Sequence, residues 1–284
     1  MYKVKNNSLF KSFNSKKYFC STNEKPLTTK LFKNNNVLGL YMNLPNTKNA
    51  ISKDFLKSLK QNIDEINQNI NIRTVILMSQ SPGYFCTGAN LKERALMTES
   101  EAKIFVTDLR NTFDTFSNLR VPTICGIDGF ALGGGLELAL CCDLRIITKN
   151  VTVGLTECGL GIIPGAGGTQ RLPRLIGVSK AKELIFTAEK IQWERCMELG
   201  IANHVVEKYD NLEEKALNIA DKIIKNGPLA VSFAKSAINE GFERDINTGL
   251  KIEWWCYGGV FGSKDRLEGL KAFAEKRTPN YKGE

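Results

Sequence analysis

The chain has 284 residues, of which 42% are hydrophobic and 24% are charged. This composition is ordinary for a globular protein and is not that of a disordered chain. No run of about eighteen apolar residues occurs, so a membrane-spanning helix is not expected. The net charge of +9 could indicate nucleic acid as a partner, but five of the lysines lie in residues 1–23, which contain no acidic residue.

Residues 1–23 differ in composition from the rest of the chain. They are rich in Lys, Ser and Asn, and they lack the continuous apolar core of a secretory signal. We expect them to be an organelle transit peptide, with a disordered basic tail as the alternative.

The segments that follow alternate between strand and helix patterns. Short apolar, β-branched runs predict strands, and apolar residues at helical spacing predict helices, with Ser52 as a possible N-cap. Strands are predicted at residues 37–44, 74–79 and 121–127, and helices at 51–66 and 101–119. Such alternation is typical of α/β units, in which helices connect parallel strands. We therefore expect an α/β core spanning residues 24–227.

The chain changes character at Pro228. Three helical segments are predicted, at residues 229–242, 246–261 and 264–277, with no strand candidate among them. No low-complexity linker separates them from the core. Residues 228–284 are therefore expected to form an α-helical C-terminal subdomain that packs on the core.

Residues 128–140 place three glycines between a strand pattern and a helix pattern. Unpaired amides at such a helix start can bind a developing oxyanion, because glycine lets a ligand approach the backbone closely. Glu137 follows in the first helical turn, near the same ligand. From spacing alone, Glu137 can equally well be a catalytic residue or a first-turn carboxylate that complements the helix dipole.

Glu157 lies in a second glycine-rich, apolar run, residues 154–171. Burial there would raise the pKa of this carboxyl and make it a proton donor near neutral pH. The alternative is an ion pair with a nearby arginine such as Arg171. A nucleotide-binding loop is not supported, because Pro164 breaks the dinucleotide fingerprint and no Gly-Lys-Ser/Thr occurs.

Other catalytic classes lack the residues that they need. His204 is the only histidine and lies in an apolar segment, which favours core packing over a catalytic triad. The eight cysteines form no C-x-x-C pair, so we expect buried thiols and no metal site.

Four motifs together resemble the enoyl-CoA hydratase/isomerase (crotonase) family from about residue 30 to the C-terminus. They are residues 85–93 (FCTGANLKE), Gly133–Gly135 with Glu137, residues 163–172 (IPGAGGTQRL), and residues 265–269 (DRLEG) with Lys276 and Arg277. Within the family, residues 91–94, 181–186 and 281–284 are most similar to the mitochondrial methylglutaconyl-CoA hydratase group, which is associated with AU-rich RNA.

The resemblance implies a crotonase-like spiral of repeated ββα units with a helical C-terminal subdomain. It further implies that the backbone amides of Ala89 and Gly134 hold the thioester oxygen in an oxyanion hole. Glu137 would deprotonate a water molecule for attack at Cβ, and Glu157 would deliver a proton to Cα. Having both glutamates favours hydration over isomerisation of the double bond, which remains an alternative.

The remaining expectations also come from the resemblance. Coenzyme A is part of the substrate, no cofactor is permanently bound, and the thioester's coenzyme A contacts Ala89, Asn90, Leu91 and Lys92. Phe273 and Lys276 would complete this pocket, from a neighbouring subunit of a homotrimer or dimer of trimers. Asn90 stands where the family usually has Asp, so a local hydrogen bond made by that Asp is called into question.

The resemblance also leads to expectations about the cellular location, the acyl group of the substrate and a possible second function. The transit peptide would direct the protein to the mitochondrial matrix, and the preferred acyl group would be methylglutaconyl. RNA binding through Lys53, Lys57 and Lys60 is the alternative from another class, but Asp54, Asp64 and Glu65 interrupt that helix face.

Overall fold

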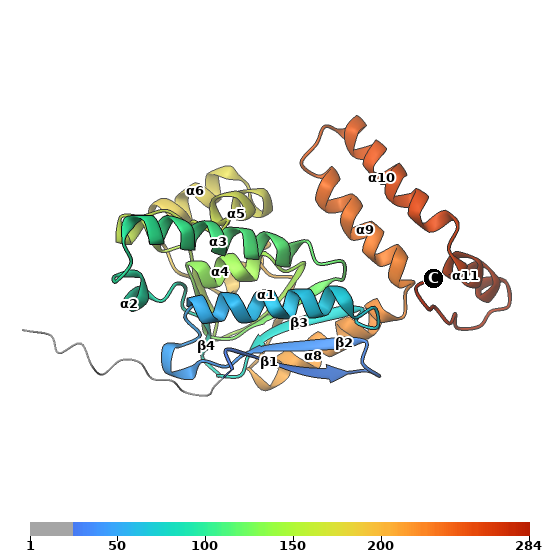
Figure 1. The fold of residues 1–284 in the computed structure, drawn as a ribbon, viewed down its shortest axis with the longest axis horizontal. Helices are drawn as coiled ribbons and strands as arrows, with labels where there is room; N and C mark the ends of the chain where they lie inside the picture. Colours follow the sequence, from blue (N-terminus) through green and yellow to red (C-terminus); the bar gives the residue numbers. More distant parts are fainter. Residues whose placement is uncertain (1–24) are drawn as a thin grey trace, which may run out of the picture.

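The larger of two β-sheets forms the centre of the protein, for which a computed structural model describes residues 25–284. Its six strands lie in the order β1-β2-β3-β5-β7-β10, and all neighbours are parallel except β1 and β2. The strands are β1 (Leu27–Phe32), β2 (Val37–Met42), β3 (Thr74–Ser79), β5 (Thr123–Ile127), β7 (Leu144–Thr148) and β10 (His204–Val206). Helices cover both faces of this sheet (Figure 1).

A smaller sheet has four strands, three of which alternate along the chain with strands of the large sheet. Its members are β4 (Tyr84–Cys86), β6 (Phe130–Leu132), β8 (Thr152–Gly154) and β9 (Ile191–Gln192), in that order. The chain therefore passes from β3 to β4, from β5 to β6 and from β7 to β8, each time from the large sheet to the small one. This repeated step, followed by helical segments, is the spiral of ββα units that the resemblance implied.

In the described part of the α/β body, eight α-helices accompany the two sheets. They are α1 (Lys53–Gln68), α2 (Leu91–Arg94), α3 (Glu99–Ser117), α4 (Gly134–Leu140), α5 (Gly168–Ile176), α6 (Val178–Phe186), α7 (Trp193–Glu198) and α8 (Asp210–Ile224), with 3-10 turns at Pro45–Thr47 and Glu157–Leu160. Leu38 and Leu40 of β2 pack in the core with α1, whereas Tyr41 packs on the other face with α8. Because both faces are covered, these strands are continuous apolar runs.

The predicted elements are confirmed with small shifts at their ends. The predicted strands correspond to β2, β3 and β5, and the predicted helices to α1 and α3. Ser52 caps α1, since its Oγ accepts a hydrogen bond from Phe55 N at 3.1 Å. Strand β1 was not predicted; it forms a hairpin with β2 through Lys33, Asn34 and Asn35, all of which have positive φ.

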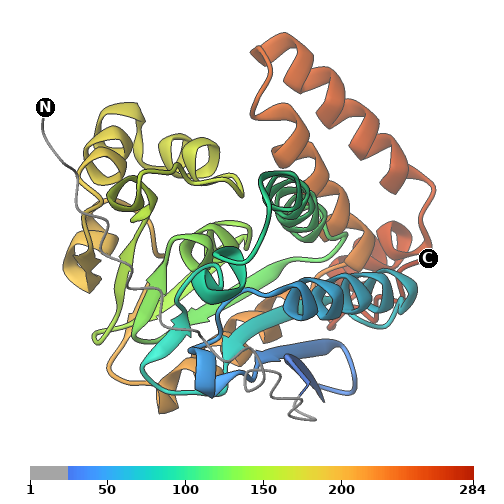
Figure 2. The same cartoon turned by 60° about the vertical axis from the view of Figure 1, so that its left-hand side comes forward.

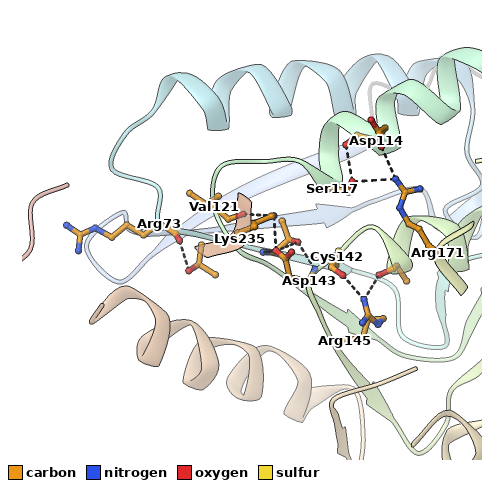
Figure 3. Close-up of polar contacts among 12 residues, drawn as sticks. Arg73, Asp114, Ser117, Val121, Cys142, Asp143, Arg145, Arg171 and Lys235 are labelled. Atoms are coloured by element: carbon orange, nitrogen blue, oxygen red, sulfur yellow. Dashed lines mark hydrogen bonds and ion pairs between the residues drawn. The ribbon is translucent and has the colours of Figure 1, made fainter. Parts of the chain in front are cut away.

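The C-terminal helices are α9 (Pro228–Gly241), α10 (Ile246–Phe261) and α11 (Lys264–Ala274), as the sequence predicted. The antiparallel pair α9 and α10 projects from the α/β body in both views (Figures 1 and 2). A buried lysine anchors α9: Lys235 Nζ donates to Asp143 Oδ2 at 2.8 Å and to Val121 O at 3.0 Å (Figure 3). Removing one partner of such a buried pair is strongly destabilising, so this contact fixes the subdomain on the core.

Two further findings concern the described part of the chain. No helix between residues 25 and 284 is long and apolar enough to cross a bilayer. The seven cysteines in this range are free thiols, and five of them are buried, while Cys20 lies outside the described residues. The predicted transit peptide also lies outside them.

Candidate active site

Three neighbouring parallel strands of the small sheet end at the same edge, where the predicted site residues follow them. Ala89 follows β4, Gly134 follows β6, and Glu157 follows β8. Ala131 of β6 lies opposite Cys86 of β4 and Val153 of β8, and the pairing of β4 with β6 has an irregularity between Tyr84 and Cys86. The fold therefore brings together residues that are far apart in the sequence.

Glu137 lies in the first turn of α4 and is only 2% exposed. Its Oε1 accepts hydrogen bonds from the backbone amides of Ala166 at 2.8 Å and Gly168 at 2.7 Å. Burial raises the pKa of this carboxyl above its ordinary value, although the two amides and the nearby arginines act in the opposite direction. Two bonds to one oxygen fix the orientation of the carboxyl group.

The glycines before Glu137 are required by close backbone contacts. Gly133 has φ +52°, and a Cβ there would lie 3.0 Å from Oε1 of Glu157. A Cβ on Gly135 would lie 2.1 Å from the carbonyl oxygen of Cys86, a backbone atom that cannot easily move. The start of α4 can therefore lie directly against β4.

Two arginines hold the 164–168 loop that carries the amides bound to Glu137. Arg110 Nε of α3 donates to Gly165 O at 3.1 Å, and Arg171 Nη1 of α5 donates to Ala166 O at 3.1 Å. Arg171 Nη2 also contacts Asp114 Oδ1 at 3.3 Å and Ser117 Oγ at 3.4 Å (Figure 3). The alternative in which Arg171 pairs with Glu157 is therefore wrong, since this guanidinium faces α3 and the loop.

Glu157 begins the 3-10 turn after β8. Its Oε2 is buried and accepts no hydrogen bond from any of residues 25–284. Burial, followed by the charge of Glu137, raises the pKa of Glu157 to about 7. A carboxyl group with this pKa can both donate and accept a proton near neutral pH.

The backbone amides of Ala89 and Gly134 have no hydrogen-bond acceptor within residues 25–284. Ile51 N donates to Gly88 O at 2.8 Å and Asn90 N donates to Ile51 O at 3.0 Å, a pattern that skips the amide of Ala89. Gly134 is the first residue of α4, where an amide has no acceptor within the helix. Neither amide donates a hydrogen bond to an acceptor in the described chain. The two lie close together, because a Cβ on Gly134 would be 3.8 Å from Ala89 N.

These groups line one pocket of about 850 Å³. Ala89, Leu91, Gly134, Glu137 and Glu157 are all in its wall. The other lining residues are Thr87, Gly88, Arg94, Val106, Leu109, Arg110, Leu132, Gly133, Thr156, Leu160, Ile162, Ile163, Pro164, Gly165, Gly167, Thr169 and Gln170. A volume of this size, with apolar walls and few charges, is typical of a site for a small organic ligand.

The remaining predicted contacts lie outside this wall. Lys92 is exposed on α2, and Asn90 caps that helix by accepting a hydrogen bond from Glu93 N at 3.3 Å. Asparagine is as good an N-cap as aspartate, so the hydrogen bond that the replacement called into question is kept. Phe273 is 87% exposed on α11 and Lys276 follows that helix, at the opposite end of the molecule from α2 (Figure 1). A single chain therefore does not bring all six predicted cofactor contacts together.

Some residues of the site were not identified from the sequence. Arg94 and Arg110 line the pocket, and Ala166 and Gly168 bind Glu137. In the sequence, each arginine lies on a helix face beside apolar residues that line the pocket. Single arginines are common on helices, so this pattern alone does not identify them as site residues. His204 is half-buried on β10 and is not among the pocket residues.

Comparisons with known proteins agree with the geometry. Residues 32–284 match the family model described as enoyl-CoA hydratase/isomerase. The mouse mitochondrial methylglutaconyl-CoA hydratase is 49% identical over 254 residues, which are 88% of this chain and 81% of that protein. Mouse enoyl-CoA hydratase domain-containing protein 2, also mitochondrial, is 44% identical over 253 residues, 88% of this chain and 86% of that one.

A solved structure shows the same architecture. The enoyl-CoA hydratase from Bacillus anthracis superimposes with a TM-score of 0.88 at 47% identity, covering 91% of this chain and all of that one. With the family model matching most of its length, and with these relatives, the chain belongs to the enoyl-CoA hydratase/isomerase family.

Proposed function

We propose that this protein adds water across the α,β double bond of an enoyl-CoA thioester. The observation that carries the proposal is one pocket wall that holds two backbone amides without partners in residues 25–284, the buried carboxyl group of Glu137 and the partly buried carboxyl group of Glu157. The amides of Ala89 and Gly134 would bind the thioester oxygen as negative charge develops on it. The protein would thereby bind the transition state more strongly than the substrate.

The two glutamates would act in sequence on the adjacent carbons. Glu137 would take a proton from a water molecule that attacks Cβ, and Glu157 would deliver a proton to Cα. The hydrogen bonds of Glu137 leave its second oxygen available, while Oε2 of Glu157 has no partner in the described chain. No permanently bound cofactor takes part in these steps, since coenzyme A belongs to the substrate.

Isomerisation of the double bond is the alternative within the family. It needs a proton moved between carbons, for which Glu157 alone would suffice, whereas hydration also needs a base for water. Glu137, held by two amides and facing the same pocket, supplies that base. RNA binding is less well supported, because Lys60 of the predicted face is paired with Asp108 of α3.

A panel of enoyl-CoA thioesters tests the proposal. We expect loss of the conjugated enoyl absorbance together with formation of a 3-hydroxyacyl-CoA, identified by mass. A product of unchanged mass with a displaced double bond would instead indicate an isomerase. Methylglutaconyl-CoA belongs in the panel as the proposed preferred substrate, because mammalian relatives carry that name.

The pH dependence of the hydration rate should follow the ionisation of Glu157. The proton for Cα must be on this carboxyl in the free enzyme, so kcat/KM is expected to fall as the pH rises through about 7. Because its pKa is raised in the folded state above the ordinary 4.5, stability is also lost as the pH rises through about 7. Glu157→Gln should therefore remove the limb near pH 7, and its Tm relative to wild type should rise as the pH increases from about 4.5 to about 7 and stay higher above that pH. A limb that persists in this variant would contradict the assignment.

We further propose that α9, α10 and α11 form the contacts of a homotrimer or a dimer of trimers. No residue of α10 is buried within the chain, and its exposed side chains include Trp254 at 64% and Trp255 at 80%. Exposed apolar faces of this kind mark protein interfaces. In the trimer, Phe273 and Lys276 of one subunit would reach the coenzyme A path of another. A monomer in sedimentation velocity would contradict this.

The proposed location is the mitochondrial matrix. The basic, acid-free composition of residues 1–23 and the mitochondrial names of the mouse relatives support it, although the relative of known structure is bacterial. Import into isolated mitochondria with cleavage near Cys20 is the expected result. Failure of import would exclude this location.

A further inference from the structure

One buried residue outside the pocket wall contacts both residues of the proposed oxyanion hole. Ile51 N donates a hydrogen bond to Gly88 O at 2.8 Å, and Asn90 N donates to Ile51 O at 3.0 Å. In this parallel bridge the N–H of Ala89 points away from Ile51. A Cβ on Gly134 would lie 3.1 Å from Cδ1 of Ile51, which is 0% exposed. The position of Ile51 therefore affects both amides.

Two residues shortly before Ile51 have an unfavourable backbone conformation. Lys48 and Asn49 follow each other with φ values of +55° and +56°. Left-handed values are rare for residues that carry a Cβ, and Asn tolerates them better than most. Such strain persists only where the surrounding structure holds the segment in place, and it is concentrated at functional sites. The contacts that hold these two residues are therefore informative.

The side chain of Asn49 supplies those contacts. It is 0% exposed, and its Oδ1 accepts a hydrogen bond from Leu44 N at 2.8 Å. Its Nδ2 donates to Ser79 Oγ at 2.7 Å, at the end of β3, and to Phe85 O at 3.0 Å, in β4. Both ends of the carboxamide are thus satisfied inside the protein, as burial of a polar group requires. The carboxamide joins the strained segment to strands of both sheets.

The main chain continues this attachment toward Ala89. Cys86 Sγ donates to Asn49 O at 3.0 Å, and Thr87 N donates to Lys48 O at 3.2 Å. Together with the parallel bridge, these bonds run alongside the stretch of chain that leads from β4 to Ala89. Loss of the carboxamide would let the strained segment relax and would shift the bridge that directs the amide.

We propose that Asn49 is a positioning residue for the oxyanion hole, and that its carboxamide sets the places of the amides of Ala89 and Gly134. The inference rests on the proposed hydratase function, since it concerns the donors that bind the thioester oxygen. Asn49 is not in the pocket wall, so it acts on the reaction only through Ile51 and the bridge. A donor stabilises an oxyanion only within hydrogen-bond distance, and a displacement of about 1 Å can cost about 10²-fold in rate.

Asn49→Gly tests the proposal, because glycine adopts positive φ without strain and the change removes only the side-chain contacts. We expect kcat for hydration of the best substrate to fall by about 10–100-fold, whereas KM changes by less than about threefold. The matched control is Asn62→Ala, which removes another buried asparagine, on α1, whose Nδ2 donates to Ser58 O at 2.8 Å. The control should keep the wild-type kcat.

A bound chromophore reports the two amides without turnover. The absorbance of 4-(dimethylamino)cinnamoyl-CoA moves to longer wavelength when its thioester oxygen accepts hydrogen bonds, because electron density shifts from the amino group toward that oxygen. Its extended conjugation disfavours hydration. At a saturating concentration we expect a smaller red shift in Asn49→Gly than in wild type, and the full wild-type shift in Asn62→Ala. A residue that only stabilised the fold would leave the red shift of the folded protein unchanged.

The other outcomes each overturn a defined claim. An undiminished red shift in Asn49→Gly, or a raised KM with unchanged kcat, would overturn the positioning role. If that variant did not fold, Ser79→Ala would decide, because it removes one acceptor of the carboxamide and leaves Phe85 O. A smaller red shift in Ser79→Ala is then expected, and wild-type values of kcat and red shift would overturn the role.

Failure of the proposed function gives a different result. A wild-type protein that binds the chromophore without a red shift would have no oxyanion hole. If wild type hydrated no thioester of the panel but gave the red shift, the hydratase function would fail, and the comparison of red shifts would still test Asn49.

Discussion

Replacing Glu137 or Glu157 by glutamine is expected to lower kcat/KM for hydration by about 10²–10⁴-fold, the usual contribution of a positioned acid or base. Glutamine keeps the size of the side chain but cannot exchange a proton. At position 137 its amide oxygen can still accept the hydrogen bonds from Ala166 and Gly168, so the fold should be retained. The measurement is the initial rate of loss of the enoyl absorbance.

The control for this pair is Glu99→Gln on α3. The Glu99 side chain is 83% exposed and pairs with Lys103, outside the pocket wall. Its substitution should change kcat/KM by less than about twofold, since exposed ion pairs contribute little. Near-full hydration by Glu137→Gln would show that the water molecule needs no base at this position, and the two-carboxylate mechanism would be wrong.

Removal of one oxyanion-hole donor should have the next largest effect. Gly134 is the first residue of α4, the helical position that tolerates proline best. Gly134→Pro removes this N–H and puts the ring Cδ in the place of its hydrogen, and kcat is expected to fall by at least about 10²–10³-fold. The measurement is single-turnover hydration at a saturating thioester concentration, which separates the chemical step from binding.

Gly134→Ala is the matched control for the missing N–H. The added Cβ would lie 3.1 Å from Cδ1 of Ile51, the flexible end of a side chain that can shift. This variant keeps the amide and should lose much less activity than the proline variant. Equal losses in the two variants, with circular dichroism showing both folded, would mean that space and not the N–H matters at this position.

Most of the fold could be predicted from local patterns. The strands of the large sheet are apolar runs, because helices cover both of its faces. The small sheet could not be predicted in the same way, since β6 and β8 have three residues each and lie inside the glycine-rich runs. Periodicity cannot identify elements so short.

The site could be predicted in part. Spacing alone left Glu137 undecided between catalysis and a dipole effect, and the amides of Ala166 and Gly168 that fix its carboxyl come from a loop far along the chain. The contacts of Arg171 could not be predicted either, because its partners on α3 depend on tertiary packing. Local sequence shows which groups are available, but not which of them meet.

The most direct test of the account is a crystal structure with an unreactive 3-ketoacyl-CoA thioester bound. We expect the thioester oxygen at about 2.7–3.2 Å from the amides of both Ala89 and Gly134. Cα should then lie next to the carboxyl of Glu157, and Cβ next to that of Glu137. A thioester oxygen that contacts neither amide, or a double-bond position remote from either carboxyl, would contradict the account.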